Sequence, residues 1–234
     1  MRFSLRILAL AAVAGFALTG SSAAQSARSE RAEVAKIPDD RFKWFFGVSA
    51  GGLLFETQRQ TRSTVPAAGA HLSVISRRAG LQVGVDEGFG SDEPSAFVDA
   101  SSNNQMRLIT FDRIRRYGFS LTGYPLRGML EPYLGVGFGL LQVLNPQFPA
   151  QESFTSADEA AASADEARSH AASGFVSALA GVQFRVGRIA AFGQGQLSSA
   201  PAAGALLRGT GYSMMAGLRF SLGSTRQDVK GGGY

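Results

Sequence analysis

The sequence predicts an all-β fold, an eight-stranded antiparallel up-and-down transmembrane β-barrel with short periplasmic turns and longer external loops. Between residues 42 and 222, apolar side chains alternate with small or polar ones at a period of two, which is typical of strands. Many of the 29 glycines recur on one strand face, which suits the crowded interior of a small barrel. After the N-terminal segment, no run approaches the roughly 20 apolar residues of a membrane-spanning helix.

The clearest hairpin lies between Tyr117 and Leu144. In its first arm Tyr117, Phe119 and Leu121 share one face. In its second arm four apolar side chains alternate with Tyr133 and three glycines; they are Leu134, Val136, Phe138 and Leu140. Glycine-rich strands pack poorly in a soluble sandwich but fit a barrel whose apolar face meets lipid. This hairpin therefore favours a membrane barrel.

Six further segments of alternating pattern extend this hairpin to an eight-strand barrel. The predicted strands cover 42–56, 66–76, 79–89, 105–125, 132–144, 174–186, 188–198 and 207–222. A polar loop is expected at 90–103, the longest loop at 145–171 and another loop at 199–205. Connections after the odd-numbered strands are longer than those after the even-numbered ones, which is the asymmetry of outer-membrane barrels.

The two ends of the chain predict export. Arg2 and Arg6 accompany an apolar run from Ile7 to Leu18, and small residues follow it, so residues 1–24 read as a signal peptide. Residues 25–41 are predicted to be a periplasmic tether, residues 42–222 the barrel and residues 223–234 a flexible tail.

Composition excludes several classes of site. The chain contains no cysteine, which excludes disulfides, thiolate chemistry and cysteine-based metal sites. The formal charge of +5 falls to +3 if Arg2 and Arg6 leave with the signal, and such a mild excess does not indicate nucleic-acid binding. We expect no cofactor and no metal site.

The longest loop contains a short repeat, in which Ser156 and Ser163 each begin the sequence Ser-Ala-Asp-Glu-Ala. A serine followed three residues later by a glutamate is a capping box, so an alanine-rich helix is expected. Its carboxylates, Asp158, Glu159, Asp165 and Glu166, are predicted to lie in solvent, because the loop lacks the ligand spacing of a calcium site.

Aromatic residues are predicted to form two girdles at the membrane interfaces. The set near the periplasmic rim contains Trp44, Phe46, Phe184 and Phe220. The set near the outer rim contains Tyr117, Phe119 and Tyr212. Arg113 and Arg115 lie just beyond the outer set, where they could bind lipid phosphates.

With these features, the chain resembles the outer-membrane β-barrel families that include the OmpA and OmpX type proteins. The resemblance covers roughly residues 42–222 and depends on the N-terminal signal, the eight strands and the hairpin segment YPLRGMLEPYLGVGFGL. It implies a bacterial outer-membrane location in a Gram-negative envelope, with outer-membrane lipid and lipopolysaccharide as surroundings. A monomer is expected, and any partner of the external loops is not identified.

The predicted interior contains a polar network that fills the lumen. Its members are Gln82, Asp86, Arg116, Gln183, Gln194, Gln196 and Arg219. An eight-stranded barrel is barely wide enough for its own side chains, and buried charges must pair, so Asp86 is expected to meet Arg116. This favours a non-enzymatic barrel that acts through its external loops or as a structural component of the outer membrane.

Three alternatives remain open. The first is a narrow, weakly anion-selective pore, supported by the basic residues expected at the periplasmic mouth. The second is a lipid A-modifying enzyme, since His71, Ser73 and Glu87 lie on adjacent strands, although Glu87 has the opposite facing parity. The third is a soluble barrel that binds an apolar ligand, which would require the apolar strand faces to point inward. No catalytic residue is assigned.

Overall fold

The computed structural model describes residues 42–60, 62–90 and 94–225. The predicted signal peptide 1–24, the tether 25–41 and residues 226–234 of the predicted tail lie outside the described residues. Within the described part, no helix is both long and apolar enough to cross a membrane.

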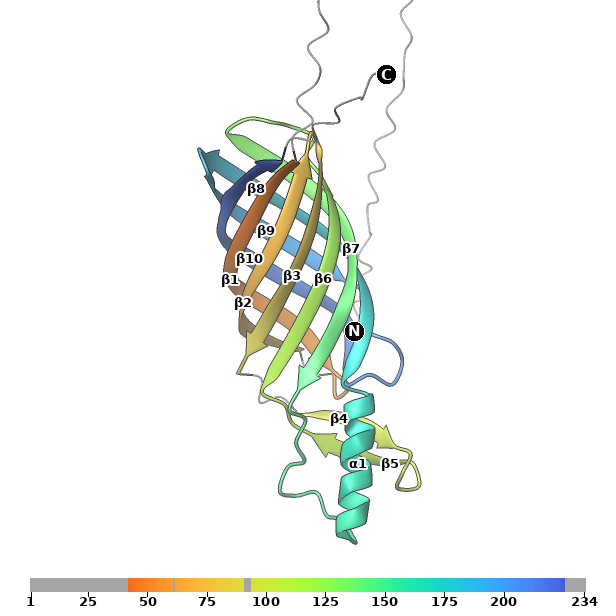
Figure 1. Cartoon of the computed structure of the whole chain (residues 1–234). Coiled ribbons are helices and arrows are strands. Elements are labelled where there is room, and N and C mark those ends of the chain that lie inside the picture. Colours follow the sequence, from red (N-terminus) through yellow and green to blue (C-terminus); the bar gives the residue numbers. More distant parts are fainter. Residues whose placement is uncertain (1–41, 61, 91–93, 226–234) are drawn as a thin grey trace, which may run out of the picture. The chain divides into compact units, whose positions relative to one another are not determined.

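Eight long strands form a closed barrel (Figure 1). They are β1 (Phe42–Thr57), β2 (Arg62–Ser76), β3 (Ala79–Phe89), β6 (Arg113–Gly123), β7 (Leu130–Leu144), β8 (Ala172–Val186), β9 (Ile189–Ser198) and β10 (Leu207–Thr225). Each strand pairs antiparallel with its neighbours in the order β1-β10-β9-β8-β7-β6-β3-β2, and β2 returns to β1. The predicted up-and-down barrel is confirmed.

The predicted fourth strand is wrong at its start. Residues Gln105–Ile109 form β5, which pairs with β4 (Ser95–Asp99) in a separate two-stranded sheet. The barrel strand β6 begins only at Arg113. The alternating pattern continued through this segment because a hairpin outside the barrel also has one buried and one exposed face. The predicted polar loop 90–103 therefore contains a strand.

The two ends of the barrel differ. At the end that we call the turn end, strands are joined through residues 77–78, 124–129 and 187–188. The opposite, loop end has long connections after β3, β7 and β9. The connection between Thr57 and Arg62 is short, because β2 begins earlier than predicted and extends its hairpin with β1.

The long connections at the loop end fold together into a structure that we call the cap, residues 94–112, 145–171 and 199–206. It contains the β4–β5 hairpin and α1 (Ala157–Ser169), both visible beyond the barrel strands in Figure 1. Ser156 caps α1, because its side chain accepts a hydrogen bond from the backbone N–H of Glu159 at 3.1 Å. The predicted helix and its first capping serine are thus confirmed.

The predicted exposure of this helix needs correction. Ser163, which begins the second repeat, lies within α1, is fully buried, and donates a short hydrogen bond to Asp99. Glu159 is not free in solvent either, since it pairs with Arg107. The helix packs one face against the β4–β5 hairpin, and Ser163 lies on that face because its hydroxyl donates to Asp99.

The apolar cores lie at the two ends of the lumen. At the turn end the core consists of Phe45, Ile75, Tyr124, Tyr133 and Leu179. At the loop end a larger core joins barrel and cap; its members include Leu53, Phe55, Val65, Phe97, Ile109, Phe111, Ala167 and Leu206. The lumen is therefore packed with apolar side chains at both ends.

Candidate functional site

Arg219 is the hub of the polar groups inside the barrel. It lies on β10, is 1% exposed, and donates from Nε to His71 Nε2 at 2.9 Å and from Nη1 to Gln183 Oε1 at 2.8 Å. Its Nη2 donates to Gln82 Oε1 at 3.1 Å and to the Tyr133 hydroxyl at 3.4 Å. These residues come from five different strands. The guanidinium thus ties opposite walls of the barrel together, through uncharged acceptors only.

A second group surrounds Glu131 near the turn end. Gln183 donates a short hydrogen bond to its carboxylate, so this group connects to Arg219 through one amide. Arg185 Nη2 lies 2.9 Å from Glu131 Oε2, and Arg127 Nη1 lies 3.6 Å from Oε1. The carboxylate itself is buried. Glu131 was not among the residues selected from sequence. The alternation of β7 could have found it, because Glu131 lies two residues before the inward Tyr133 and so faces the lumen.

Asp86 and Arg116 form the third group, nearer the loop end. The β3–β6 register places them opposite one another, and Arg116 Nη2 donates to Asp86 Oδ2 at 2.8 Å. The same nitrogen donates to the Ser213 hydroxyl at 2.9 Å, whereas the buried Nη1 has no hydrogen-bond partner among the described residues. Arg116 is 2% exposed. One donor of a buried cation is therefore left unused by the protein.

Gln194 and Gln196 project from β9 toward these groups. Gln194 Oε1 accepts from the Tyr133 hydroxyl at 3.0 Å, which connects it to Arg219. A cavity of about 40 Å³ lies between the groups, and both glutamines contribute to its wall. The structure thus brings all seven polar residues selected from sequence into one region, together with His71, Tyr133 and Ser213.

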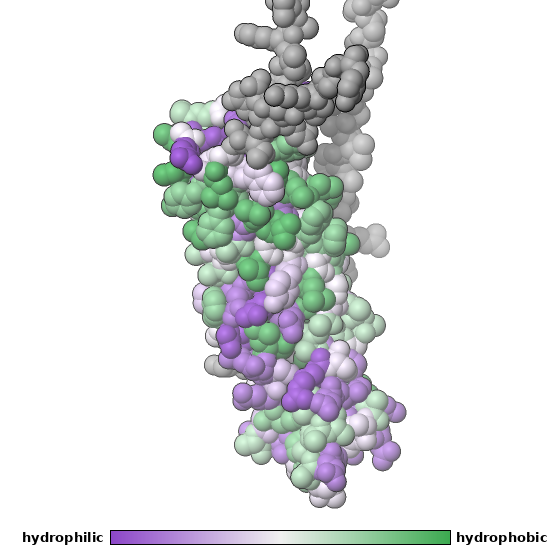
Figure 2. Space-filling view, viewed as in Figure 1, coloured by the Kyte–Doolittle hydropathy of each residue, from purple (hydrophilic) through white to green (hydrophobic). Residues whose placement is uncertain are grey.

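The outer face of the barrel is apolar over the half nearer the turn end (Figure 2). Figure 2 shows hydrophobic side chains gathered over the half nearer the turn end, and polar ones between that zone and the cap. Exposed side chains of this face include Val83, Leu121, Leu134, Val136, Phe138, Val176, Val182, Met214 and Leu222. The apolar strand faces therefore point outward, opposite to the arrangement of a soluble ligand-binding barrel.

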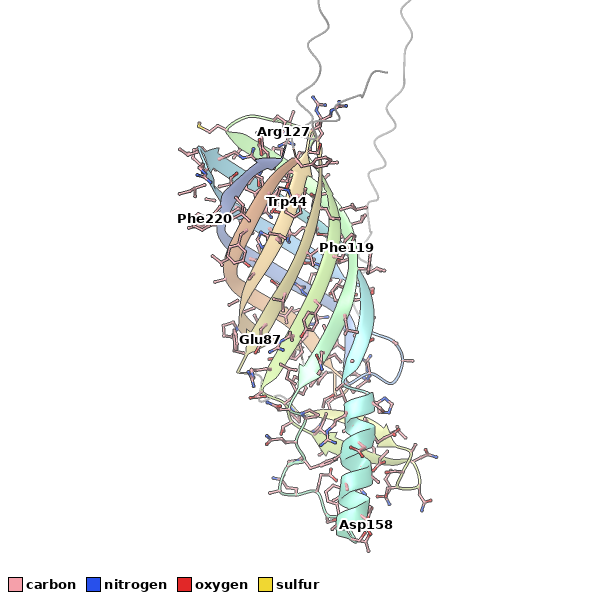
Figure 3. All side chains as sticks on the ribbon, viewed as in Figure 1. Trp44, Glu87, Phe119, Arg127, Asp158 and Phe220 are labelled. Atoms are coloured by element: carbon pink, nitrogen blue, oxygen red, sulfur yellow. The ribbon has the colours of Figure 1, made fainter. Side chains whose placement is uncertain are left out.

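The aromatic residues selected as girdles lie on this outer face at different heights. Trp44, Phe46, Tyr117, Phe184, Tyr212 and Phe220 are each 38% to 50% exposed. Figure 3 places Trp44 and Phe220 toward the turn end. Phe119 lies two residues nearer the turn end than Tyr117, and its ring lies 5.1 Å from that of Phe138. The assignment of these aromatic residues to two girdles stays a prediction.

Charged pairs border this zone on the loop-end side. Arg115 Nη2 lies 2.7 Å from Glu87 Oε2, and Arg113 Nη1 lies 3.2 Å from Glu87 Oε1. Glu87 is on the outer face of β3 (Figure 3), whereas His71 faces the lumen and accepts from Arg219. The three residues His71, Ser73 and Glu87 therefore do not converge on a common point.

A buried ionic cluster holds the cap together. Arg107 Nε donates to Asp99 Oδ2 at 2.8 Å, and its Nη1 lies 3.6 Å from Glu152 Oε2. Its Nη2 pairs with Glu159 on α1 through a short contact and donates to the Ser102 hydroxyl at 3.1 Å. The guanidinium also stacks on Phe154, 4.4 Å from the ring centroid. One arginine thus connects the β4–β5 hairpin, the 145–156 segment and α1.

Two carboxylates of this cluster, Asp99 and Glu159, are held ionised. Burial by itself raises the pKa of Asp99, but hydrogen bonds from Ser101, Ser163 and Arg107 outweigh it and lower the pKa to about 2. Hydrogen bonds from Thr155 and Ser102 likewise lower the pKa of Glu159 to about 2. The cap therefore keeps its ion pairs at neutral and mildly acidic pH.

No protein-family model matches the chain, and no curated protein matches its sequence. Among solved structures, the crystal structure of Neisserial surface protein A (NspA) is similar, with a TM-score of 0.49 and 13% sequence identity. The match covers 76% of this chain and 96% of that chain.

Proposed function

We propose that this chain is a non-enzymatic outer-membrane barrel that holds its cap on the outer side of the membrane, where the cap performs the function. The observation that supports this most strongly is the outward apolar face. Its exposed side chains surround a closed barrel, which has no free strand edge and satisfies its backbone hydrogen bonds internally. In water such a surface would favour aggregation, whereas in a bilayer it meets lipid.

The two ends of the barrel differ in charge as well as in loop length. The cap contains seven carboxylates and two arginines; the carboxylates are Asp99, Asp112, Glu152, Asp158, Glu159, Asp165 and Glu166. The turn end is basic, with Arg77, Arg78, Arg127 and Arg188. Short turns on the periplasmic side and long structured loops outside are the usual arrangement of outer-membrane barrels. We also propose that the barrel is of the OmpA and OmpX type.

Membrane lipid and lipopolysaccharide are the proposed surroundings. The Arg113–Glu87–Arg115 group lies on the outer face at the border of the apolar zone, and two guanidinium groups share one carboxylate there. The unshared donors suit lipid phosphate oxygens, which form strong charge-assisted hydrogen bonds with arginine. We also propose that the barrel is a monomer and that the cap binds a partner.

A conducting role has less support than a surface role. Both ends of the lumen are packed with apolar side chains, and the cavity between its polar groups measures about 40 Å³. An enzymatic role also has little support, because Glu87 lies outside the barrel while His71 is committed to Arg219.

The orientation can be tested by labelling single cysteines, since the chain contains no cysteine of its own. Ala161→Cys lies on the exposed face of α1, and Gly128→Cys lies in the exposed 124–129 turn. In intact cells, a membrane-impermeant maleimide should label position 161 and leave position 128 unlabelled until the outer membrane is permeabilised. Labelling in the reverse order, or recovery of the mature chain in the soluble fraction without detergent, would refute the proposal.

A further inference from the structure

The interior of the barrel carries more positive than negative charge. Lys43 points inward but is exposed at the rim. The remaining inward charges on the described barrel strands are three arginines, Arg116, Arg185 and Arg219, and two carboxylates, Asp86 and Glu131. Arg116 pairs with Asp86, and Arg185 pairs with Glu131. Arg219 is the unbalanced charge, because it forms no ion pair with any carboxylate of the described residues.

Arg219 cannot relieve this imbalance by losing its proton, since a guanidinium stays charged in proteins. Its acceptors are His71, Gln82, Gln183 and Tyr133, which satisfy its geometry but carry no negative charge. A buried cation without a counter-charge is costly even when it is hydrogen-bonded. The field of this extra charge therefore extends into the neighbouring cavity, whose wall includes His71 and Gln82.

The cavity has the donors that an anion needs. Arg116 contributes to its wall, and the Nη1 atom of this side chain is buried without a hydrogen-bond partner among the described residues. Gln194 and Gln196 also line it and offer amide donors. Asp86 shares the wall, but its charge is matched by Arg116, which leaves the surplus of Arg219.

We propose that this cavity binds one small monoatomic anion, with chloride as the physiological example. The volume of about 40 Å³ holds roughly two or three water-sized spheres, which admits a halide and excludes a phosphate ester or an organic acid. The anion balances the interior charge and receives hydrogen bonds from Arg116 Nη1 and the glutamine amides. The site does not depend on the location of the barrel, and it makes the anion a bound component of the lumen.

Bromide provides a direct test, because its anomalous scattering identifies it in crystals of the detergent-solubilised protein grown or soaked in sodium bromide. The expected result is a peak inside the cavity, within hydrogen-bonding reach of Arg116 Nη1. The absence of a peak in the cavity would overturn the proposal, whatever bromide sites occur on the surface.

Stability in solution provides the second test, at constant ionic strength with sodium gluconate replaced stepwise by sodium chloride. Above the dissociation constant, the unfolding midpoint should rise by about 4 °C for each tenfold increase in chloride. In Gln194→Glu, the new carboxylate supplies the missing charge and keeps an oxygen acceptor for Tyr133. This variant should be more stable than the wild type in gluconate and should lose the chloride response.

The matched control is Gln105→Glu, the same change at an exposed position of β5 in the cap. It should keep the full chloride response of the wild type. An equal chloride response in Gln194→Glu and the wild type would show a general salt effect and overturn the proposal. If Gln194→Glu fails to fold, the bromide experiment on the wild type decides the question alone.

Discussion

Arg107 Nε lies 2.8 Å from Asp99 Oδ2, and the two side chains expose only 4% and 0% of their surface. This pair lies inside the cap, where Ser163 of α1 also donates to the same carboxylate oxygen. A buried charge pair of this kind contributes little net stability over an apolar pair, but removal of one partner is costly because the other charge stays buried. The cap should therefore be sensitive to change at either residue.

Arg107→Leu should open the cap and leave the barrel folded. Loss of the guanidinium leaves Asp99 buried without its charge partner, at a cost of about 3 to 5 kcal/mol. Hydrogen exchange of peptides from β4, β5 and α1 should become fast, while exchange in β7 and β8 stays slow. The control Arg168→Leu removes an exposed ion pair with Asp165, which is worth less than about 1 kcal/mol, and should leave exchange unchanged.

Acid should open the same structure. Because the folded pKa of Asp99 is lowered to about 2, ionisation of this carboxylate stabilises the cap above the unfolded pKa near 4. That contribution is lost as pH falls from about 4 toward 2, and Glu159 acts in the same direction. The protection factors of the amides in residues 95–109, measured between pH 5 and 2 and corrected for the intrinsic exchange rate at each pH, should fall in this window. Asp99→Asn should start with a weakened cap and show a smaller acid effect.

Phe138 tests whether the outer face meets lipid. The side chain is 59% exposed on β7, so Phe138→Arg would be tolerated if this surface faced water. In a bilayer, an arginine near the midplane of a barrel costs about 2 to 4 kcal/mol. We expect Phe138→Arg to lower the yield of folded barrel and its unfolding midpoint in lipid vesicles, and Phe138→Leu to behave as the wild type. Equal behaviour of both variants would contradict the lipid-facing assignment.

Gly139, on the inward face of β7, and Gly193, on the outward face of β9, form a pair that tests how crowded the interior is. A Cβ at Gly139 would lie 2.1 Å from the Tyr117 carbonyl oxygen and 2.6 Å from the Phe175 ring, whereas a Cβ at Gly193 would meet nothing within 4 Å. Gly139→Ala should therefore impair barrel assembly, and Gly193→Ala should be tolerated. Heat-modifiable electrophoretic migration of the folded barrel measures both. A well-folded Gly139→Ala barrel would mean that β7 can shift to make room.

The packed lumen predicts the outcome of a conductance measurement. Reconstituted protein in planar bilayers should show no large steady conductance, because apolar cores close both ends of the polar interior. Reproducible porin-sized openings of the wild type would contradict this prediction and favour the pore alternative.

Most of the barrel could be predicted from sequence because strand alternation is a local signal. At Leu134 to Leu140 the outward apolar residues and inward glycines repeat without interruption, so strand and facing follow together. Asp86 and Arg116 could be paired from sequence because the alternation placed both on the inward faces of neighbouring strands. The continuous antiparallel register of β3 and β6 sets them opposite one another.

The cap could not be predicted in the same way, because its contacts join residues that are far apart in the sequence. Arg107 meets Glu159, which lies 52 residues later, and no periodic pattern connects them. The pattern at Gln105–Ile109 correctly indicated a strand, but alternation alone does not identify its partner. Ser163 matched a capping box, and only packing against Asp99 showed that it is a buried interior residue of α1.

The closing seam of the barrel sets an order of events in folding. Residues at opposite ends of the described chain meet where β1 pairs with β10, as in Phe42 with Thr225, and such distant pairing is kinetically slow. Leu53 and Phe55 of β1 share one apolar core with Leu207 of β10 and with Phe97 and Leu206 of the cap. The cap cannot complete its core until this seam has formed. During refolding, the amides of β4 and β5 should therefore become protected from hydrogen exchange last, after the barrel has closed.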